Sequence, residues 1–293
     1  LAGEGGLVWI KERGLSRNHH LVDTERGIGD GIRALRSNLT DAEYYQAGYD
    51  AYEVTSANSN GFSLGLNLTN ETNRSASDYA SWTFRKAPKF FTCLTYTGTG
   101  SAQNISHDLG SVPGTIIVKR TSATEDWLVY HRSTGNEAGT GLNETAATYT
   151  GVSAYWNSTT PTDSVFTVGT HDRVNTSGQT YVAYIFAHND GDGGFNGGDI
   201  IKCGSYTTDG SGNATVDLGW EPQFVITKKT SGTSDWNIWD TMRGWTNGSN
   251  YDYIAANSSA AETGNSNYGN PTSTGFTSNG VIGTNSNGIY IAI

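Results

Sequence analysis

The 293-residue sequence has little methionine, cysteine, proline or charge, with one Met, two Cys, five Pro and 16% charged residues. Two cysteines cannot form a disulfide framework, and no apolar run approaches the roughly 18 residues of a membrane-spanning helix. Eighteen Lys and Arg against 28 Asp and Glu give a net charge of −10, which argues against binding nucleic acid through its phosphates. No apolar signal segment is present and the sequence begins at Leu1, so we expect a processed or excerpted piece of a longer chain.

The sequence is rich in Gly, Thr, Ser, Asn and aromatic residues, including 38 Gly, 16 Tyr, nine Phe and eight Trp. Aromatic side chains supply core area, which argues against disorder. Strong helix formers are scarce, whereas Thr and the aromatic residues favour strands and Gly and Asn favour turns. We therefore predict an all-β fold with many turns.

An internal repeat determines the predicted organisation. Three segments of 21 residues align without gaps: 7–27, 115–135 and 224–244. Each holds a β-rich run, a lysine, a polar turn, a second apolar run and a final glycine, which predicts a β-hairpin. Related leading segments at 90–114 and 200–223 precede the second and third hairpins only, and each copy ends with another predicted strand.

The repeat unit is about 100–110 residues long, with turn signals every 8–12 residues or so, which predicts tandem β-sandwiches of the jelly-roll or immunoglobulin-like kind. The predicted repeats are residues 1–86, 87–190 and 199–293, and the first lacks its leading strands. The missing strands of the first repeat could come from a neighbouring chain or from upstream sequence. Short links between such units predict a stiff rod or plate.

Residues that recur in all copies are interpreted as structural. The shared polar positions are Lys11, Lys119 and Lys228, and Asp23, His131 and Asp240. A Lys/Asp combination on a hairpin predicts a cross-strand ion pair, with a place in a glycan site as the alternative. Trp127 and Trp236 share one position, which His19 occupies in the first copy, and are predicted core anchors. Cys93 and Cys203 also correspond and are predicted small apolar core residues.

Residues outside the repeat pattern are the candidates for function. Exposed Trp rings stack on sugar rings, so we predict a glycan-contact surface from the less regular tryptophans, Trp156, Trp220 and Trp245. A Gly-rich loop holds candidate Ca²⁺ ligands, Asp190, Asp192 and Asp199. Because their spacing is not that of an EF-hand, a plain linker between repeats is the main interpretation of that loop.

Several common catalytic signatures are missing: the sequence lacks a P-loop, a dinucleotide fingerprint and zinc-site spacings. His19 and His20 would face opposite sides of a strand and so could not bind one metal ion. Glu12, Glu125 and Asp126 lie in predicted hairpin loops, but the third copy shares no acid pair with them. We therefore expect no enzyme activity, no cofactor and no resident metal.

The ordered set of motifs resembles a repeat domain found in virion proteins of marine bacteriophages. The matching segments include LVWIKERG (7–14), FTCLTYTGTGS (91–101), HDLGSVPGTIIVKRT (107–121) and IIKCGSYTTDGSG (200–212). The chain is similar over nearly its whole length to regions of cyanophage and pelagiphage tail-fibre or other structural proteins. The resemblance implies a virion surface component and supplies no catalytic residues.

From these observations we expect a bacteriophage virion structural protein, a fibre or appendage subunit on the particle surface that contacts host surface glycans. The expected partners are other virion proteins and further copies of the chain, not nucleic acid or a membrane interior. Two alternatives stay open. One is a soluble carbohydrate-binding or glycan-cleaving protein, and the other is a purely architectural filament or decoration protein.

Overall fold

The computed structural model describes residues 3–191, 197–246, 251–266 and 268–293. These residues form short antiparallel strands joined by turns, with only brief helical segments, so the all-β prediction is confirmed. Among the described residues, none of the helices has the length and apolar character that crossing a membrane requires. The three predicted repeats are called the first, second and third unit below.

The first unit contains a three-stranded sheet in the order β2-β1-β7 and two small hairpins, β3-β4 and β5-β6. Its strands are β1 (Gly6–Glu12), β2 (His20–Asp23), β3 (Ile32–Ala34), β4 (Tyr44–Gln46), β5 (Val54–Asn58), β6 (Gly61–Leu64) and β7 (Tyr79–Arg85). The apolar run of β1 is buried on both faces. On one face Val8 and Ile10 pack in a small core with Val54 of β5.

The second unit places a four-stranded sheet, β11-β10-β15-β8, beside the pair β14-β9. Its strands are β8 (Phe91–Thr97), β9 (Gln103–Ser106), β10 (Pro113–Arg120), β11 (Leu128–His131), β12 (Ala138–Gly139), β13 (Tyr149–Thr150), β14 (Val165–Val168) and β15 (Thr180–Ala187). Two single-turn helices are α1 (Ser153–Trp156) and α2 (Asp172–Asn175). Phe166 of β14 lies edge-on to Tyr96 of β8, which joins the two sheets.

The third unit has a six-stranded sheet, β16-β24-β18-β19-β20-β21, and a three-stranded sheet, β17-β23-β22. Its strands are β16 (Lys202–Thr207), β17 (Asn213–Asp217), β18 (Phe224–Lys229), β19 (Trp236–Asp240), β20 (Tyr251–Ala255), β21 (Thr263–Ser266), β22 (Pro271–Thr272), β23 (Gly275–Asn279) and β24 (Asn287–Ala292). The 3-10 turn η2 (Thr241–Arg243) follows β19. Val216, Phe276 and Tyr290 belong to a core between the two sheets.

The three predicted hairpins are confirmed and share one register. Each hairpin pairs the same aligned positions: Trp9 with Leu21, Ile117 with Val129, and Ile226 with Ile238. Each closing strand then pairs with the first hairpin strand in a common register too: Trp82 with Trp9, Tyr184 with Ile117, and Ile291 with Ile226. The sequence repeat is therefore a repeat of strand pairing.

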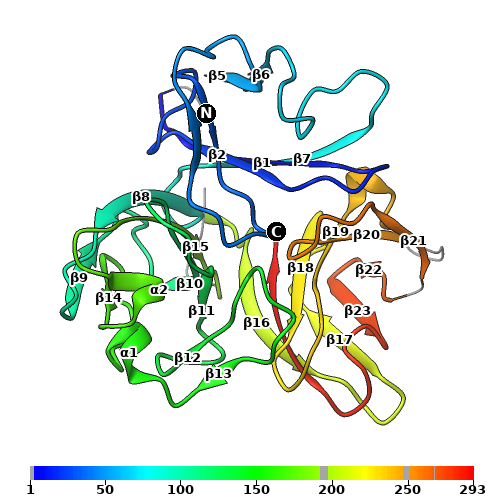
Figure 1. Cartoon of the computed structure of the whole chain (residues 1–293). Helices are drawn as coiled ribbons and strands as arrows, with labels where there is room; N and C mark the ends of the chain where they lie inside the picture. Colours follow the sequence, from blue (N-terminus) through cyan, green and yellow to red (C-terminus); the bar gives the residue numbers. More distant parts are fainter. Residues whose placement is uncertain (1–2, 192–196, 247–250, 267) are drawn as a thin grey trace.

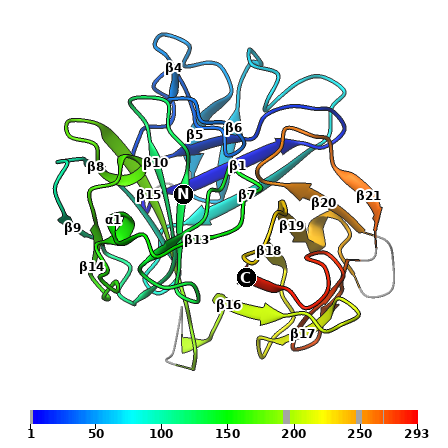
Figure 2. The same ribbon diagram turned by 60° about the horizontal axis from the view of Figure 1, so that its bottom comes forward.

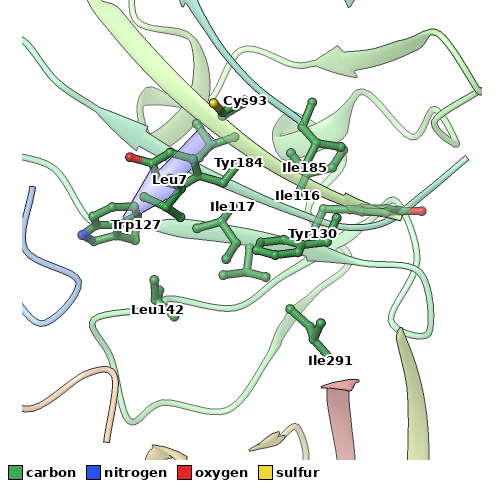
Figure 3. Close-up of a cluster of buried hydrophobic side chains, with 14 of the residues drawn as sticks. Leu7, Cys93, Ile116, Ile117, Trp127, Tyr130, Leu142, Tyr184, Ile185 and Ile291 are labelled. Atoms are coloured by element: carbon green, nitrogen blue, oxygen red, sulfur yellow. The ribbon is translucent and has the colours of Figure 1, made fainter. Parts of the chain in front are cut away.

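The units surround a common centre, where the C-terminus lies (Figure 1). A second view shows the same three-lobed arrangement (Figure 2). The largest buried cluster draws side chains from all three units, including Leu7, Ile117 and Ile291, which are labelled in Figure 3. The predicted rod is wrong, because the three units do not follow one another in a line: the inward faces of their sheets are apolar and pack against one another.

Candidate functional site

An arm from each unit lies along the hairpin of the next unit. The arms are residues 36–43, 141–148 and 255–262, at aligned positions of the repeat. Their backbone contacts are Glu43 N–H to the Thr121 carbonyl (2.8 Å), Thr148 N–H to that of Thr230 (3.1 Å) and Glu262 N–H to that of Arg13 (2.7 Å). The first unit thus reaches the second, the second reaches the third and the third reaches the first. The contacts close a ring within one chain.

The shared lysine is a buried part of this joint. Lys119 Nζ donates to three carbonyl oxygens: Thr40 at 3.0 Å, Arg120 at 2.9 Å and Glu125 at 2.9 Å. Thr40 belongs to the arm of the first unit, so the ammonium group ties two units together. Burial lowers the pKa of Lys119 to about 8, and the carbonyl oxygens take the place of water around its charge.

The other two lysines are also fully buried, and burial lowers the pKa of each to about 8. Lys228 Nζ donates to the carbonyl of Thr145 in the second arm, at 2.9 Å, and to that of Ser234. Lys11 Nζ donates to the carbonyl of Glu12, at 2.6 Å. The predicted cross-strand Lys/Asp ion pair is wrong, because these lysines bind backbone carbonyl groups. Their burial also removes them from any glycan surface.

The aromatic position beside the lysine makes an aligned contact in all three joints. Each side chain donates to a carbonyl oxygen of an arm: Trp127 Nε1 to Arg36 (3.1 Å), Trp236 Nε1 to Gly141 (2.8 Å) and His19 Nε2 to Ala255 (3.0 Å). Trp9 Nε1 donates to Nδ1 of His19 at 2.8 Å, so the proton of the neutral ring lies on Nε2. Burial lowers the pKa of His19 to about 3 and keeps it neutral. The core-anchor prediction for Trp127 and Trp236 is confirmed.

A second contact at each joint uses the polar residue after the second hairpin strand. Asp23 Oδ2 accepts from Tyr184 Oη (2.7 Å), Asp240 Oδ2 accepts from Trp82 Nε1 (2.9 Å), and His131 Nε2 lies 3.1 Å from the Tyr290 carbonyl oxygen. Both aspartates are also paired with a nearly buried arginine, Arg26 or Arg243, at 2.6 Å. The shared polar residues are therefore the contacts of a structural ring.

The cysteines fit the predicted core role, since Cys93 and Cys203 are buried and unoxidised. His19 and His20 are buried as well, and His20 Nδ1 lies 3.2 Å from Glu71. Within the described ranges, His, Cys, Asp and Glu side chains form no group of three or more able to hold a metal ion. Of the candidate Ca²⁺ ligands, Asp192 lies outside the described residues.

Two of the three predicted glycan-contact residues are in the core. Trp156 is 1% exposed and its Nε1 donates to the carbonyl of Ala138 at 2.8 Å. Trp245 is 3% exposed, donates to the carbonyl of Gly269 at 3.1 Å and packs against Trp239. The prediction that both rings meet a ligand is wrong, because each fills its own unit. Irregular spacing in the repeat does not imply exposure.

Trp220 is half-buried and lines an open groove with the candidate loop residues Asp190 and Asp199. The groove has a volume of about 610 Å³, and its other described walls are Gly191, Gly197, Lys202, Leu218 and Gly219. We call it the Trp220 groove. The structure thus brings together residues from two separately predicted sites, the glycan-contact surface and the Ca²⁺ loop.

Short contacts fix the walls of the Trp220 groove. Lys202 Nζ lies 5.3 Å from the Trp220 ring centroid and donates to the Leu218 carbonyl at 2.9 Å. Asp199 Oδ2 accepts from the backbone N–H of Gly191 at 2.7 Å. Lys202 was not predicted, because nothing in the sequence of β16 indicates that it lies against a tryptophan 18 positions later. The aromatic face of Trp220 can stack on a sugar ring. The carboxylates and the ammonium group can form hydrogen bonds with the hydroxyl groups of that sugar.

One family model, described as a domain of unknown function (DUF7483), matches residues 3–293. No curated protein and no solved structure matches the chain.

Proposed function

The chain belongs to the DUF7483 family, and we propose that it is a structural subunit of a bacteriophage virion, an appendage protein that contacts host surface glycans. In this proposal its three units are β-sandwich repeats displayed on the particle surface. Its partners are other virion proteins and further copies of the chain. The contact with glycans is made in the Trp220 groove.

Two observations support a structural role: the resemblance of the motifs to virion proteins, and the contacts that the shared residues make between units. Contacts between units are made by buried lysines, indoles and aspartates, each at the aligned position of two units: Lys119 and Lys228, Trp127 and Trp236, Asp23 and Asp240. A chain that uses its repeated polar residues for internal contacts is suited to a rigid building block. In the second and third units a second sheet faces the central sheet, which supports the description as sandwiches.

The glycan part depends on one observation, the gathering of Trp220, Asp190 and Asp199 around an open groove. A tryptophan face offers a sugar ring apolar contact area, and carboxylate oxygens accept hydrogen bonds from its hydroxyls. The groove is open to solvent, which suits a chain end or branch of a surface polysaccharide.

Replacing Trp220 with alanine is expected to weaken glycan binding about tenfold, because the stacking surface is lost. Binding of the wild-type and variant chains to a glycan array and to intact host cells measures this. Tyr49→Ala is the matched control, because Tyr49 is an exposed aromatic residue outside the groove-lining set. Equal binding by the wild type and the Trp220 variant would contradict a glycan site in this groove.

The virion assignment has a separate test. A labelled antibody against the chain is expected to decorate purified particles of the phage that encodes it. Particles without label would contradict the assignment. Release of reducing ends from a host polysaccharide, lost in Asp190→Asn, would favour the glycan-cleaving alternative.

A further inference from the structure

The closing strand of the first unit has a free edge. In the second unit β15 lies between β10 and β8, and in the third β24 lies between β18 and β16. Strand β7 pairs with β1 on one edge, and no strand among the described residues pairs with the other. Within the part of the chain that the structure describes, the first unit therefore has no counterpart of β8 and β16.

The two counterpart strands are placed in one register. Cys93 of β8 pairs with Tyr184, and Cys203 of β16 pairs with Ile291. Tyr184 and Ile291 correspond to Trp82 in the shared register. A strand paired with β7 would therefore place the residue equivalent to Cys93 and Cys203 opposite Trp82. Two residues earlier, Phe91 pairs with Phe186, whose counterpart on β7 is Phe84.

A groove of about 430 Å³ runs beside the free edge of β7. Ala80, Trp82 and Phe84 of β7 line it, and Gln223, Phe224 and Ile293 of the third unit are among its other walls. Gln223 is the aligned counterpart of Gly114, the residue against which Cys203 packs across the joint between the second and third units. The groove thus continues an interface that is already built twice, where β8 lies against β1 and β16 against β10.

The backbone of β7 is oriented to receive a strand. Lys86 N–H donates to Gly5 and Arg13 N–H donates to Asp78, so the even-numbered residues of β7 bond toward β1. The N–H and C=O groups of the alternate residues, including Ser81 and Thr83, therefore face the free edge. In the second unit the counterparts of these two residues, Ala183 and Ile185, pair with β8.

We propose that an extended strand of another polypeptide docks antiparallel on β7 and completes the sheet of the first unit. Its sequence follows the pattern of β8 and β16, with a bulky apolar residue opposite Phe84 and a small residue two positions later opposite Trp82. Its outward side chains are polar, because Ser81, Thr83 and Arg85 of β7 are exposed on that face. This inference does not depend on the proposed function.

A second copy of the chain fits the edge less well. Pairing two β7 strands would set Trp82 and Phe84 of one copy against the bulky side chains of the other. In the second and third units, by contrast, the residue opposite the counterpart of Trp82 is a cysteine. Met242, which is 93% exposed, also lines the groove and offers a flexible apolar contact to a foreign strand.

The test uses a fluorescent peptide with the sequence of residues 89–98, carrying C93A and flanking lysines for solubility, and a scrambled peptide as control. The intact chain is expected to bind the first peptide saturably and not the second, as measured by fluorescence polarisation. Binding is expected to slow hydrogen exchange of the Ser81 and Thr83 amides about tenfold, because both gain a strand partner. No binding and no change in exchange would overturn the proposal.

Thr83→Pro provides the variant test, because proline removes an N–H that faces the free edge and leaves the bonds to β1 in place. We expect at least about tenfold weaker peptide binding with an unchanged circular dichroism spectrum. If the variant fails to fold, the exchange measurement on the wild-type chain still decides. A doubled mass by light scattering, with Ser81 and Thr83 protected in the absence of peptide, would overturn the proposal in favour of a second copy.

Discussion

Asp23→Ala is expected to lower the free energy of unfolding by about 3–5 kcal/mol, the usual effect of removing one partner from a buried ion pair. Asp23 is fully buried and accepts from Arg26 Nε at 2.6 Å, from the Arg26 backbone N–H at 2.9 Å and from Tyr184 Oη at 2.7 Å. Without it, Arg26 loses its closest carboxylate and Tyr184 loses its acceptor across the joint. Urea unfolding followed by tryptophan fluorescence measures the change.

Asp30 provides a matched control in the same unit. It also pairs with an arginine three residues later, Arg33, but at 3.5 Å and with a side chain that is 74% exposed. Solvent screens such a pair, so Asp30→Ala is expected to change stability by about 0.5 kcal/mol or less. Equal effects of the two substitutions would contradict the role given to the buried aspartate.

Lys119→Met is expected to destabilise the chain by about 3 kcal/mol or more, because it removes a buried donor that bonds three carbonyl groups, of which, among the described residues, only that of Thr40 keeps another donor, the Glu125 N–H. The three acceptors belong to Thr40, Arg120 and Glu125, and methionine fills the space without replacing a single hydrogen bond. Relief from burying the ammonium charge offsets part of this cost. The same urea experiment gives the size of the effect.

Lys229→Met is the control for that substitution. Lys229 follows Lys228, the counterpart of Lys119, and is only half-buried. A substitution of a residue in contact with solvent is expected to cost about 0.5 kcal/mol or less. If Lys119→Met is as stable as the wild type, the hydrogen bonds of Lys119 to the three carbonyl groups do not hold the joint.

The sequence was sufficient to predict the three repeated hairpins and the strands that lead and close the units, because alternation and turn residues are local signals. The common register of Trp9, Ile117 and Ile226 follows from the gap-free alignment. The ring closure was not predictable in the same way, since a repeat specifies each unit and not the contacts between units. One sequence feature does indicate the arms: an asparagine recurs at the same aligned position of each arm, and it accepts a hydrogen bond from a backbone N–H of its own hairpin. These residues are Asn38, Asn143 and Asn257.

Side-chain roles were harder to predict than strands. A lysine on a strand next to an aspartate suggests an ion pair, but the acceptors of Lys119 include a carbonyl 79 positions earlier in the sequence. Trp156 and Trp245 lie outside the repeat pattern and still fill local cores. Trp220 lines an open groove, so its role as a glycan contact stays a prediction, and its neighbour Lys202 was recognised only in the structure.

The central claim is that the three units form one closed ring with a shared core. Scanning calorimetry of the whole chain and of Asp23→Ala tests it most directly. The ring predicts a single transition whose calorimetric and van't Hoff enthalpies agree, and a shift of that entire transition to lower temperature in the variant. Separate transitions for the units, with only one of them moved by Asp23→Ala, would contradict the claim.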